Sequence, residues 1–302
     1  MQAVLKHRLL SAEQIQRLCL PCQEGNSLRG RLEYTRQLLR VLTHHKYLVR
    51  RRLIGDETGQ NPLVFASTWK GAQAVAAHLQ CSPQEVGWDV HDKVITWANE
   101  NLHHLVAENE VYIRLAHACE NASVEIQAWQ SDRALYRRHQ GKKVSYTGPH
   151  GGMYHKVLIP DGYYELARQV SREGRTGTIV DRLLIEVDMG TQTLAQRQKT
   201  IKRPQRTWEH KVKAYQAFFQ PGGVYEQLYG SSKGRVLTIT PSERRLLDMK
   251  KVTEDVGGNE RFWYCTFDEF VAKKIYTDRI YMVATKPGTY CLFGDALANS
   301  SN

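Results

Sequence analysis

The sequence lacks the features of exported, membrane-spanning and disulfide-built proteins. In its 302 residues no uninterrupted apolar run approaches the roughly 20 residues needed to cross a bilayer, and residues 1–7 do not form the apolar core of a signal peptide. Cysteine is scarce, with six residues, which argues for reduced thiols rather than a disulfide framework. We therefore expect a cytoplasmic protein with no membrane partner.

Cys19 and Cys22 are the one cysteine pair with the spacing of a metal or redox site. Zinc would need a second pair or histidines at suitable spacing, and none follows Cys22 closely. A thioredoxin-like role would need a preceding strand, whereas the residues before Cys19 predict a helix. We interpret the pair as a helix end followed by a turn.

Negative charge is also in short supply. The net charge is +11, and residues 1–80 hold 12 Lys and Arg against 5 Asp and Glu, which leaves +4 for the other 222 residues. A chain of this length can form two domains, each with its own core. The basic N-terminal quarter suggests a polyanionic partner, with nucleic acid ahead of an acidic membrane surface.

Residues 1–80 predict a winged helix-turn-helix. Ser11 can cap a helix that runs to about Cys19, with Gln14 reaching back to complete a capping box. The other predicted elements are helices over residues 2–9, 27–42 and 68–79, strands over 47–53 and 62–66, and a wing loop over 55–61.

The predicted helix over residues 27–42 is the candidate recognition helix. Its apolar positions near the helical period are Leu28, Leu32, Tyr34, Leu38, Leu39 and Leu42. The candidate DNA-binding residues of this module are Arg29, Arg31, Arg36 and Arg40 on the helix and Arg50, Arg51 and Arg52 on the next strand. The alternative is that these arginines form a solvated face.

A connector over residues 81–95 separates this module from a larger domain over 96–290, with a tail over 291–302. We expect a long helix over 96–119, an alternating strand over 122–129, and a loop or ragged hairpin over 136–154. Later elements are a helix over 207–219, a strand over 235–240, a capped helix from 241–243, a strand over 261–266 and a helix over 267–274.

Two apolar runs in the larger domain end in acids. Residues 156–159 lead to Pro160-Asp161 and residues 183–185 lead to Glu186 and Asp188, so both runs predict buried strands, separated by residues 168–177, that deliver carboxylates at their ends. Carboxylate oxygens are suitable ligands for Mg²⁺ or Mn²⁺, and Asp161 and Glu186 are the candidate metal ligands. Alternatively, Asp161 opens a turn and the other acids lie on an exposed strand edge.

Basic residues gather after the second acidic run. Between Arg197 and Lys213 there are seven Lys and Arg against one acid, Glu209. A phosphate backbone could lie there. The candidates for its contacts are Lys199, Lys202, Arg203 and Arg206.

A helix, then strands bearing an Asp and a Glu-x-Asp, then a helix bearing Lys211 resembles the core of the PD-(D/E)-x-K nuclease superfamily. Behind a winged helix, it resembles the replication-relaxation family of plasmids and mobile elements; the segments that carry this likeness are residues 104–111, 160–162, 185–191, 211–215 and 235–242. The resemblance implies an α+β protein in which an N-terminal winged helix-turn-helix precedes an α/β restriction-endonuclease-like domain. Asp188 departs from the pattern by standing where the superfamily has lysine, so that lysine either comes from the following helix, as Lys211 or Lys213, or is absent. Its absence would mean a nuclease-like fold retained only for binding.

The leading hypothesis is a metal-dependent DNA endonuclease or nickase linked to plasmid replication or relaxation. In it Asp161 and Glu186 bind the metal and Lys211 orients the attacking water. Asp188 and Glu110 assist as ligands or through waters. His104 contacts phosphate, or is simply a histidine hydrogen-bonded at a helix surface.

The main rival hypothesis is a non-catalytic DNA-binding regulator of replication or transcription that uses a degenerate nuclease fold. A third, a relaxase with a tyrosine nucleophile, is weaker because His44-His45 and His103-His104 lack the alternating spacing that would point two imidazoles to one side of a strand. The expected partners are duplex DNA, a second copy of the chain in a homodimer, and other proteins of the mobile element.

Overall fold

The structure is a computed structural model that describes residues 1–20, 28–55, 61–122, 124–148, 151–172, 175–195 and 206–293. The chain divides into two compact units, Met1–Ile113 and Arg114–Asn302. The division falls inside one long helix, α5 (Asn99–Ala122). Among the described residues, none of the helices combines the length and the apolar character that a membrane span requires.

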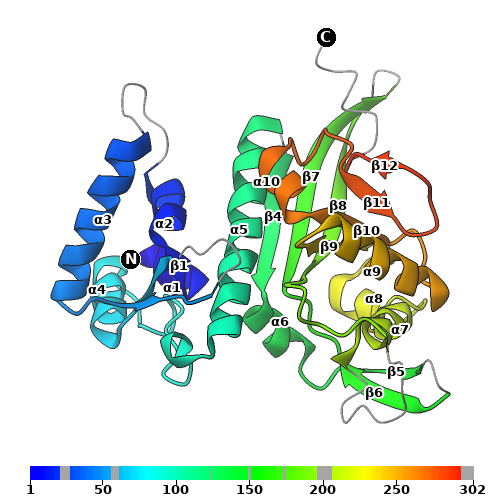
Figure 1. Ribbon diagram of the computed structural model, residues 1–302, viewed down its shortest axis with the longest axis horizontal. Helices are drawn as coiled ribbons and strands as arrows, with labels where there is room; N and C mark the ends of the chain where they lie inside the picture. Colours follow the sequence, from blue (N-terminus) through cyan, green and yellow to red (C-terminus); the bar gives the residue numbers. More distant parts are fainter. Residues whose placement is uncertain are drawn as a thin grey trace. The chain divides into compact units, whose positions relative to one another are not determined.

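The first unit packs helices around a small antiparallel sheet with the strand order β1-β3-β2 (Figure 1). Its elements are α1 (Gln2–His7), β1 (Leu10–Ser11), α2 (Ala12–Cys19), α3 (Leu28–His44), β2 (Leu48–Arg52), β3 (Leu63–Ser67), α4 (Trp69–Leu79) and the 3-10 helix η1 (Val94–Thr96), followed by α5. The predicted helices and both predicted strands are present, whereas the short strand β1 was not expected. Cys22 and residues 56–60 of the predicted wing lie outside the described residues.

The start of α2 confirms the predicted capping box. The Ser11 hydroxyl accepts a hydrogen bond from the Gln14 amide at 3.2 Å, and the Gln14 side chain accepts one from the Ser11 amide at 3.1 Å. These two bonds satisfy donors that the first helical turn would otherwise leave without partners. The short sequence Ser-x-x-Gln therefore fixes where α2 begins.

Helix α3 has a narrower buried face than its apolar residues suggested. Leu39 is buried, with Leu32 and Leu42 packed against the same core, but Tyr34 and Leu38 are 54% and 42% exposed. Tyr34 and Leu38 occupy apolar positions near the helical period but are not part of the buried face. Only one stripe of a helix surface can face a single neighbouring layer, and Tyr34 and Leu38 fall beside that stripe.

The second unit is built on a seven-stranded sheet with the order β12-β11-β10-β9-β8-β7-β4. Strand β8 runs parallel to β9, and β9 parallel to β10, while the other neighbours are antiparallel. The strands of this sheet are β4 (Val124–Ser131), β7 (Gly162–Arg172), β8 (Arg175–Val187), β9 (Arg235–Thr240), β10 (Phe262–Thr266), β11 (Tyr281–Val283) and β12 (Thr289–Tyr290). The other elements are α6 (Asp132–His139), β5 (Lys143–Thr147), β6 (Met153–Val157), α7 (Trp208–Phe218), α8 (Val224–Tyr229), α9 (Glu243–Asp255) and α10 (Phe267–Ala272).

The strand that brings Asp161 to the sheet is not the predicted one. Residues 156 and 157 end β6, which pairs with β5 in a separate hairpin, and Asp161 directly precedes β7. Strands β7 and β8 then form one long hairpin through most of the region predicted to separate two strands. Because β7 and β8 are antiparallel, the start of β7 lies beside the end of β8, so both acidic segments still reach the same edge.

The sheet is covered on both faces. Along β8, Leu184 packs in the core formed with α7, α8 and α9, which gather on one side in Figure 1, while Leu183 and Ile185 are buried on the other side. A strand buried on both faces reads as a continuous apolar run, as residues 183–185 do. Glu186 follows this run and faces the same side as Leu184, toward α7.

Candidate functional site

Asp161 and Glu186 are held at neighbouring strand ends. The Asp161 amide donates to the Ile185 carbonyl at 3.0 Å, and one Asp161 carboxylate oxygen accepts from the Val187 amide at 2.8 Å. Gly162, the first residue of β7, is the register partner of Ile185. These backbone contacts fix Asp161 on both sides of the residue that carries the second carboxylate.

Helix α7 brings two polar side chains to Glu186. Lys211 forms an ion pair with one carboxylate oxygen, and the Tyr215 hydroxyl donates to the other. Residues four apart lie on one face of a helix, so Lys211 and Tyr215 reach the same carboxylate together. The Glu186 side chain is only 3% exposed, so its ionised form is stabilised by these two partners rather than by water.

The electrostatics of the site couple its two acids. Burial raises the pKa of Glu186 to about 7, with Lys211 lowering it and the nearby Asp161 raising it further. Burial lowers the pKa of Lys211, but the charges of Glu186, Asp161 and Asp188 outweigh this effect and raise it above its usual value. Lys211 therefore stays positively charged beside the carboxylates of Glu186 and Asp161.

Asp188 forms an ion pair with Arg245, a residue of α9. Arg245 donates through Nε to Oδ2 at 2.7 Å and through Nη2 to Oδ1 at 3.0 Å, and the Asp188 side chain is 3% exposed. The same guanidinium also donates to the Gln192 carbonyl. Both Asp188 oxygens thus serve a two-point ion pair that fixes the segment after β8.

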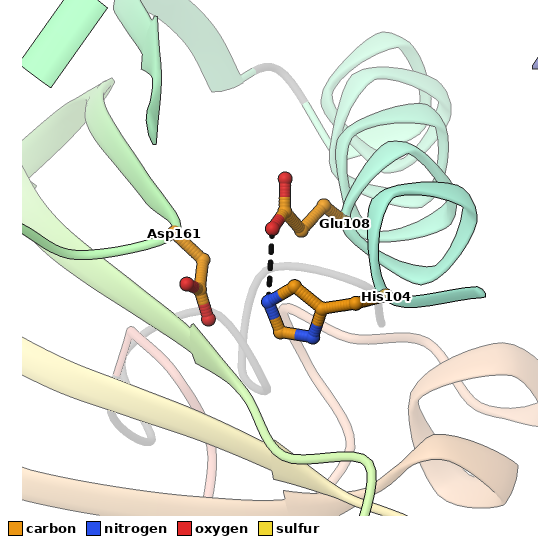
Figure 2. Close-up of side chains that lie close together, drawn as sticks. All are labelled: His104, Glu108 and Asp161. Carbon is orange, nitrogen blue, oxygen red and sulfur yellow. Dashed lines mark ion pairs between the residues drawn. The ribbon is translucent and has the colours of Figure 1, made fainter. Parts of the chain in front are cut away.

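Glu110 and His104 lie on the part of α5 that belongs to the first unit. Glu110 accepts from Arg17 Nη1 at 2.6 Å and pairs with α2 through that arginine. His104 forms an ion pair with Glu108, one helical turn away, with Nε2 and Oε1 at 2.9 Å (Figure 2). Sequence reasoning had nominated His104 and Glu110 but not Glu108, whose i, i+4 spacing from His104 was the available signal.

The candidate DNA-binding arginines of the first unit fall into two groups, partly buried and exposed. Arg51 is partly buried and donates to the backbone carbonyls of Ile95 at 3.0 Å and Trp97 at 2.6 Å, so it anchors β2 to η1. Arg31 is also partly buried. The exposed arginines are Arg29, Arg36, Arg40, Arg50 and Arg52, of which Arg36 pairs with Glu13 at 3.1 Å.

Four basic residues before α7 are candidates for phosphate contacts, and Arg206 is the one that lies within the described residues. It is exposed, and its carbonyl accepts a hydrogen bond from Gln192 at 2.9 Å, just ahead of α7. The other three, Lys199, Lys202 and Arg203, lie outside the described residues.

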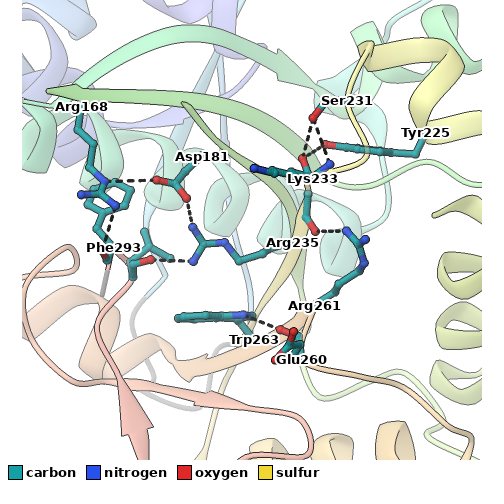
Figure 3. Close-up of polar contacts among 12 residues, drawn as sticks. Arg168, Asp181, Tyr225, Ser231, Lys233, Arg235, Glu260, Arg261, Trp263 and Phe293 are labelled. Carbon is teal, nitrogen blue, oxygen red and sulfur yellow. Dashed lines mark hydrogen bonds and ion pairs between the residues drawn. The ribbon is translucent and has the colours of Figure 1, made fainter. Parts of the chain in front are cut away.

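A second polar cluster includes Asp181, which alternation along β8 places on the face opposite to Leu184 and Glu186. Figure 3 shows its side chains. Asp181 pairs with Arg235 and with Arg168, the latter at 3.5 Å. Arg168 also donates to the Phe293 carbonyl at 3.1 Å, and Arg235 to the Leu292 carbonyl at 2.7 Å. The cluster joins β7, β8 and β9 to the chain near residue 293, so its groups are engaged in holding the fold together.

The carboxylates of Asp161 and Glu186 suit a hard divalent cation. Both supply oxygen ligands, and each lies close enough to affect the ionisation of the other. Glu186 is buried and Asp161 is partly buried, and two like charges in such a setting need a compensating cation, which Lys211 provides. Asp161 and Glu186 are the residues that could hold such a cation, on condition that Lys211 gives up part of its contact with Glu186.

The family model described as Replication-relaxation matches residues 1–233 of the chain. The protein belongs to this family. The match includes the whole first unit and, in the second, Asp161, Glu186, Asp188 and Lys211. No curated protein and no solved structure matches the chain.

Proposed function

We propose that this protein acts on DNA during the replication or relaxation of a plasmid or related mobile element, as a metal-dependent endonuclease or nickase. The observation that carries the proposal is the meeting of Asp161 and Glu186 at adjacent strand ends with Lys211 against them. Family membership supports the biological setting. The geometry of the carboxylates supports the chemistry.

The order of elements supports a nuclease-like core. Strands β4, β7 and β8 form an antiparallel meander, helix α7 follows, and β9 then lies parallel to β8. Asp161 stands before the second strand of this set, Glu186 near the end of the third, and Lys211 on the helix. This order supports the nuclease-like core that we propose from the resemblance to the PD-(D/E)-x-K superfamily.

The residues of the site would have different roles in DNA cleavage. Asp161 and Glu186 would hold the divalent cation, which when bound activates water and polarises the phosphate. Lys211 would exchange its contact with Glu186 for one with the water or the phosphate and so offset negative charge that develops during cleavage. Tyr215 would keep the Glu186 carboxylate oriented during that exchange, because its hydroxyl donates to the other oxygen.

The first unit would bind the duplex as a winged helix. Its helices and antiparallel strands occur in the required order, and α3 carries Arg29, Arg36 and Arg40 on its exposed surface. Arg50 and Arg52 add two exposed cations on β2. Such residues contact phosphates and position a protein on DNA without performing the reaction.

The second candidate function is a DNA-binding regulator without catalysis. It is favoured by the partners that the acids already have: Lys211 and Tyr215 engage both oxygens of Glu186, and Arg245 engages both oxygens of Asp188. If Lys211 never leaves Glu186, the site is a structural ion pair.

Incubation of the protein with supercoiled DNA that carries the sequence flanking its gene, in Mg²⁺ or Mn²⁺, tests the choice. We expect wild type and the control Asp255→Ala, altered at an exposed acid of α9, to nick the DNA. Asp161→Ala should bind the DNA but leave it intact, because a metal ligand is lost. Intact DNA with all three proteins, despite binding, would select the regulator.

A further inference from the structure

Thr238 lies next to Glu186 in the sheet. Strands β8 and β9 run parallel, and their register places Thr238 directly beside Glu186. Two residues earlier the register pair is Leu184 and Val236, and both side chains belong to the core that includes residues of α7. Because side chains alternate along a strand, Thr238 faces the same side as Glu186, at a strand separation of about 4.8 Å. The threonine hydroxyl is therefore a neighbour of the buried carboxylate.

The Thr238 hydroxyl is buried without a hydrogen-bond partner. The residue is 0% exposed, and among the residues that the structure describes nothing pairs with its Oγ1. Thr240, the next residue on this face of β9, donates instead to the Ser242 carbonyl at 3.2 Å. An unpaired buried hydroxyl destabilises a folded protein, and valine, which has nearly the same shape, would avoid this penalty. The hydroxyl is thus available to an acceptor that comes within reach in another state of the site.

Of the two residues beside Thr238 in the sheet, Glu186 offers the acceptor. The other is Tyr264 on β10, whose hydroxyl is bonded instead to that of Thr253 on α9, at 2.5 Å. A carboxylate accepts hydrogen bonds at both oxygens, and each oxygen can accept more than one. Rotation about the Cα–Cβ bond of Thr238 moves Oγ1 among three staggered positions, so the hydroxyl can turn toward β8.

The proposed cleavage of DNA changes the surroundings of Glu186. Lys211 pairs with one carboxylate oxygen, and Tyr215 donates to the other. In the role given to it above, Lys211 leaves Glu186 for the attacking water or the phosphate, while Tyr215 stays. The oxygen that loses Lys211 then needs another donor from the protein, because a carboxylate that is 3% exposed has little access to water. Thr238 is a neighbouring side chain that can supply it.

We propose that Thr238 is a positioning residue for Glu186, and that its hydroxyl donates to the carboxylate oxygen which Lys211 leaves when a divalent cation binds. With Tyr215 on the other oxygen, the carboxylate then keeps its orientation toward the cation. The inference rests on the proposed function, since it takes a divalent cation as the ligand of Asp161 and Glu186. It gives a role to a residue that follows the span of the family match, which ends at residue 233.

Manganese binding by the full chain tests the proposal in the absence of DNA. Free and bound Mn²⁺ are measured by electron paramagnetic resonance for wild type, Thr238→Val and Thr238→Ser. Thr238→Val should bind Mn²⁺ several-fold more weakly, because Glu186 loses a donor that orients it, whereas Thr238→Ser keeps a hydroxyl and should bind nearly as wild type does.

Thr240→Val is the matched control on the same face of β9. Its hydroxyl serves the Ser242 carbonyl, so the variant should keep the affinity of wild type for Mn²⁺. Equal affinity of wild type and Thr238→Val, or an equal loss in Thr238→Val and Thr240→Val, would overturn the role of Thr238 and leave the proposed function standing. If wild type binds no Mn²⁺, both fail.

A double-mutant cycle in EDTA separates positioning from packing. Thr238→Val alone should leave the urea midpoint unchanged or slightly raised, because within the described part of the chain the hydroxyl has no partner to lose. In a Lys211→Met background the hydroxyl turns to Glu186, so the same change should shift the equilibrium toward the unfolded state by roughly tenfold. Equal effects in both backgrounds would overturn the proposal. If Lys211→Met does not fold, the comparison of manganese affinities decides.

Discussion

Arg245 holds both carboxylate oxygens of Asp188, with contacts of 2.7 and 3.0 Å across the gap between α9 and the segment after β8. Removal of one partner from a buried ion pair leaves an uncompensated charge, which typically destabilises a protein by about 3–5 kcal/mol. Arg245→Met should therefore lower the free energy of unfolding by that order in urea titrations. Arg244→Met, at the exposed neighbouring position, should change it by less than about 0.5 kcal/mol. Equal stability of both variants would mean that the pair does not form in solution.

Tyr215 should lower the pKa of Glu186 through a hydrogen bond rather than through a charge. Its hydroxyl donates to the carboxylate and favours the ionised form, so Tyr215→Phe should raise the pKa of Glu186 above its value of about 7. A hydrogen bond to a charged group typically contributes about 1.5–3 kcal/mol, and the variant should be less stable by that order at alkaline pH. The Glu186 pKa can be followed by NMR with carboxyl-labelled glutamate. An unchanged pKa would show that the hydroxyl does not reach the carboxylate.

Glu186 should make stability depend on pH. Its pKa is raised from 4.5 to about 7 in the folded chain, so between these values the folded state binds more protons than the unfolded state. The free energy of unfolding should therefore fall as pH rises across this interval and level off above it. Glu186→Gln should lack this contribution, whereas Glu243→Gln, at the exposed start of α9, should keep it. Parallel pH profiles for wild type and Glu186→Gln would refute the assignment.

The two groups of arginines on β2 should have different effects. Arg50→Ala with Arg52→Ala removes two exposed cations and should reduce the slope of log K against log salt by about 1.8 for duplex DNA, with little loss of stability. Arg51→Ala removes two hydrogen bonds to backbone carbonyls and should instead destabilise the fold by about 1–3 kcal/mol. Fluorescence anisotropy and thermal unfolding separate the two effects. A salt slope that falls equally in both variants would contradict the distinction.

Local patterns in the sequence predicted much of the fold. The capping box at Ser11 and the apolar run before Glu186 describe interactions within a few residues, and both led to elements that the structure contains. The segment before Asp161 was misread because an apolar run does not reveal which sheet a strand joins. Residues 156–157 pair with β5, so β7 rather than that run carries Asp161 to the edge.

In the candidate site, too, the sequence did not reveal contacts that depend on how the elements pack. Glu186 and Lys211 were nominated from their order in the chain, and the structure brings them into contact, although their function stays a prediction. Tyr215 was missed despite its position four residues after Lys211, because nothing in the sequence indicates which face of α7 meets β8.

The bonds from Arg168 and Arg235 to the carbonyls of Phe293 and Leu292 have a consequence for protein synthesis. They join the middle strands of the sheet to residues made 125 and 57 positions later. While the nascent chain is still on the ribosome, Asp181 must balance two arginines whose remaining acceptors have not yet been made. The second unit can therefore complete its fold only after residue 293 has left the ribosome, whereas the first unit is free to fold long before.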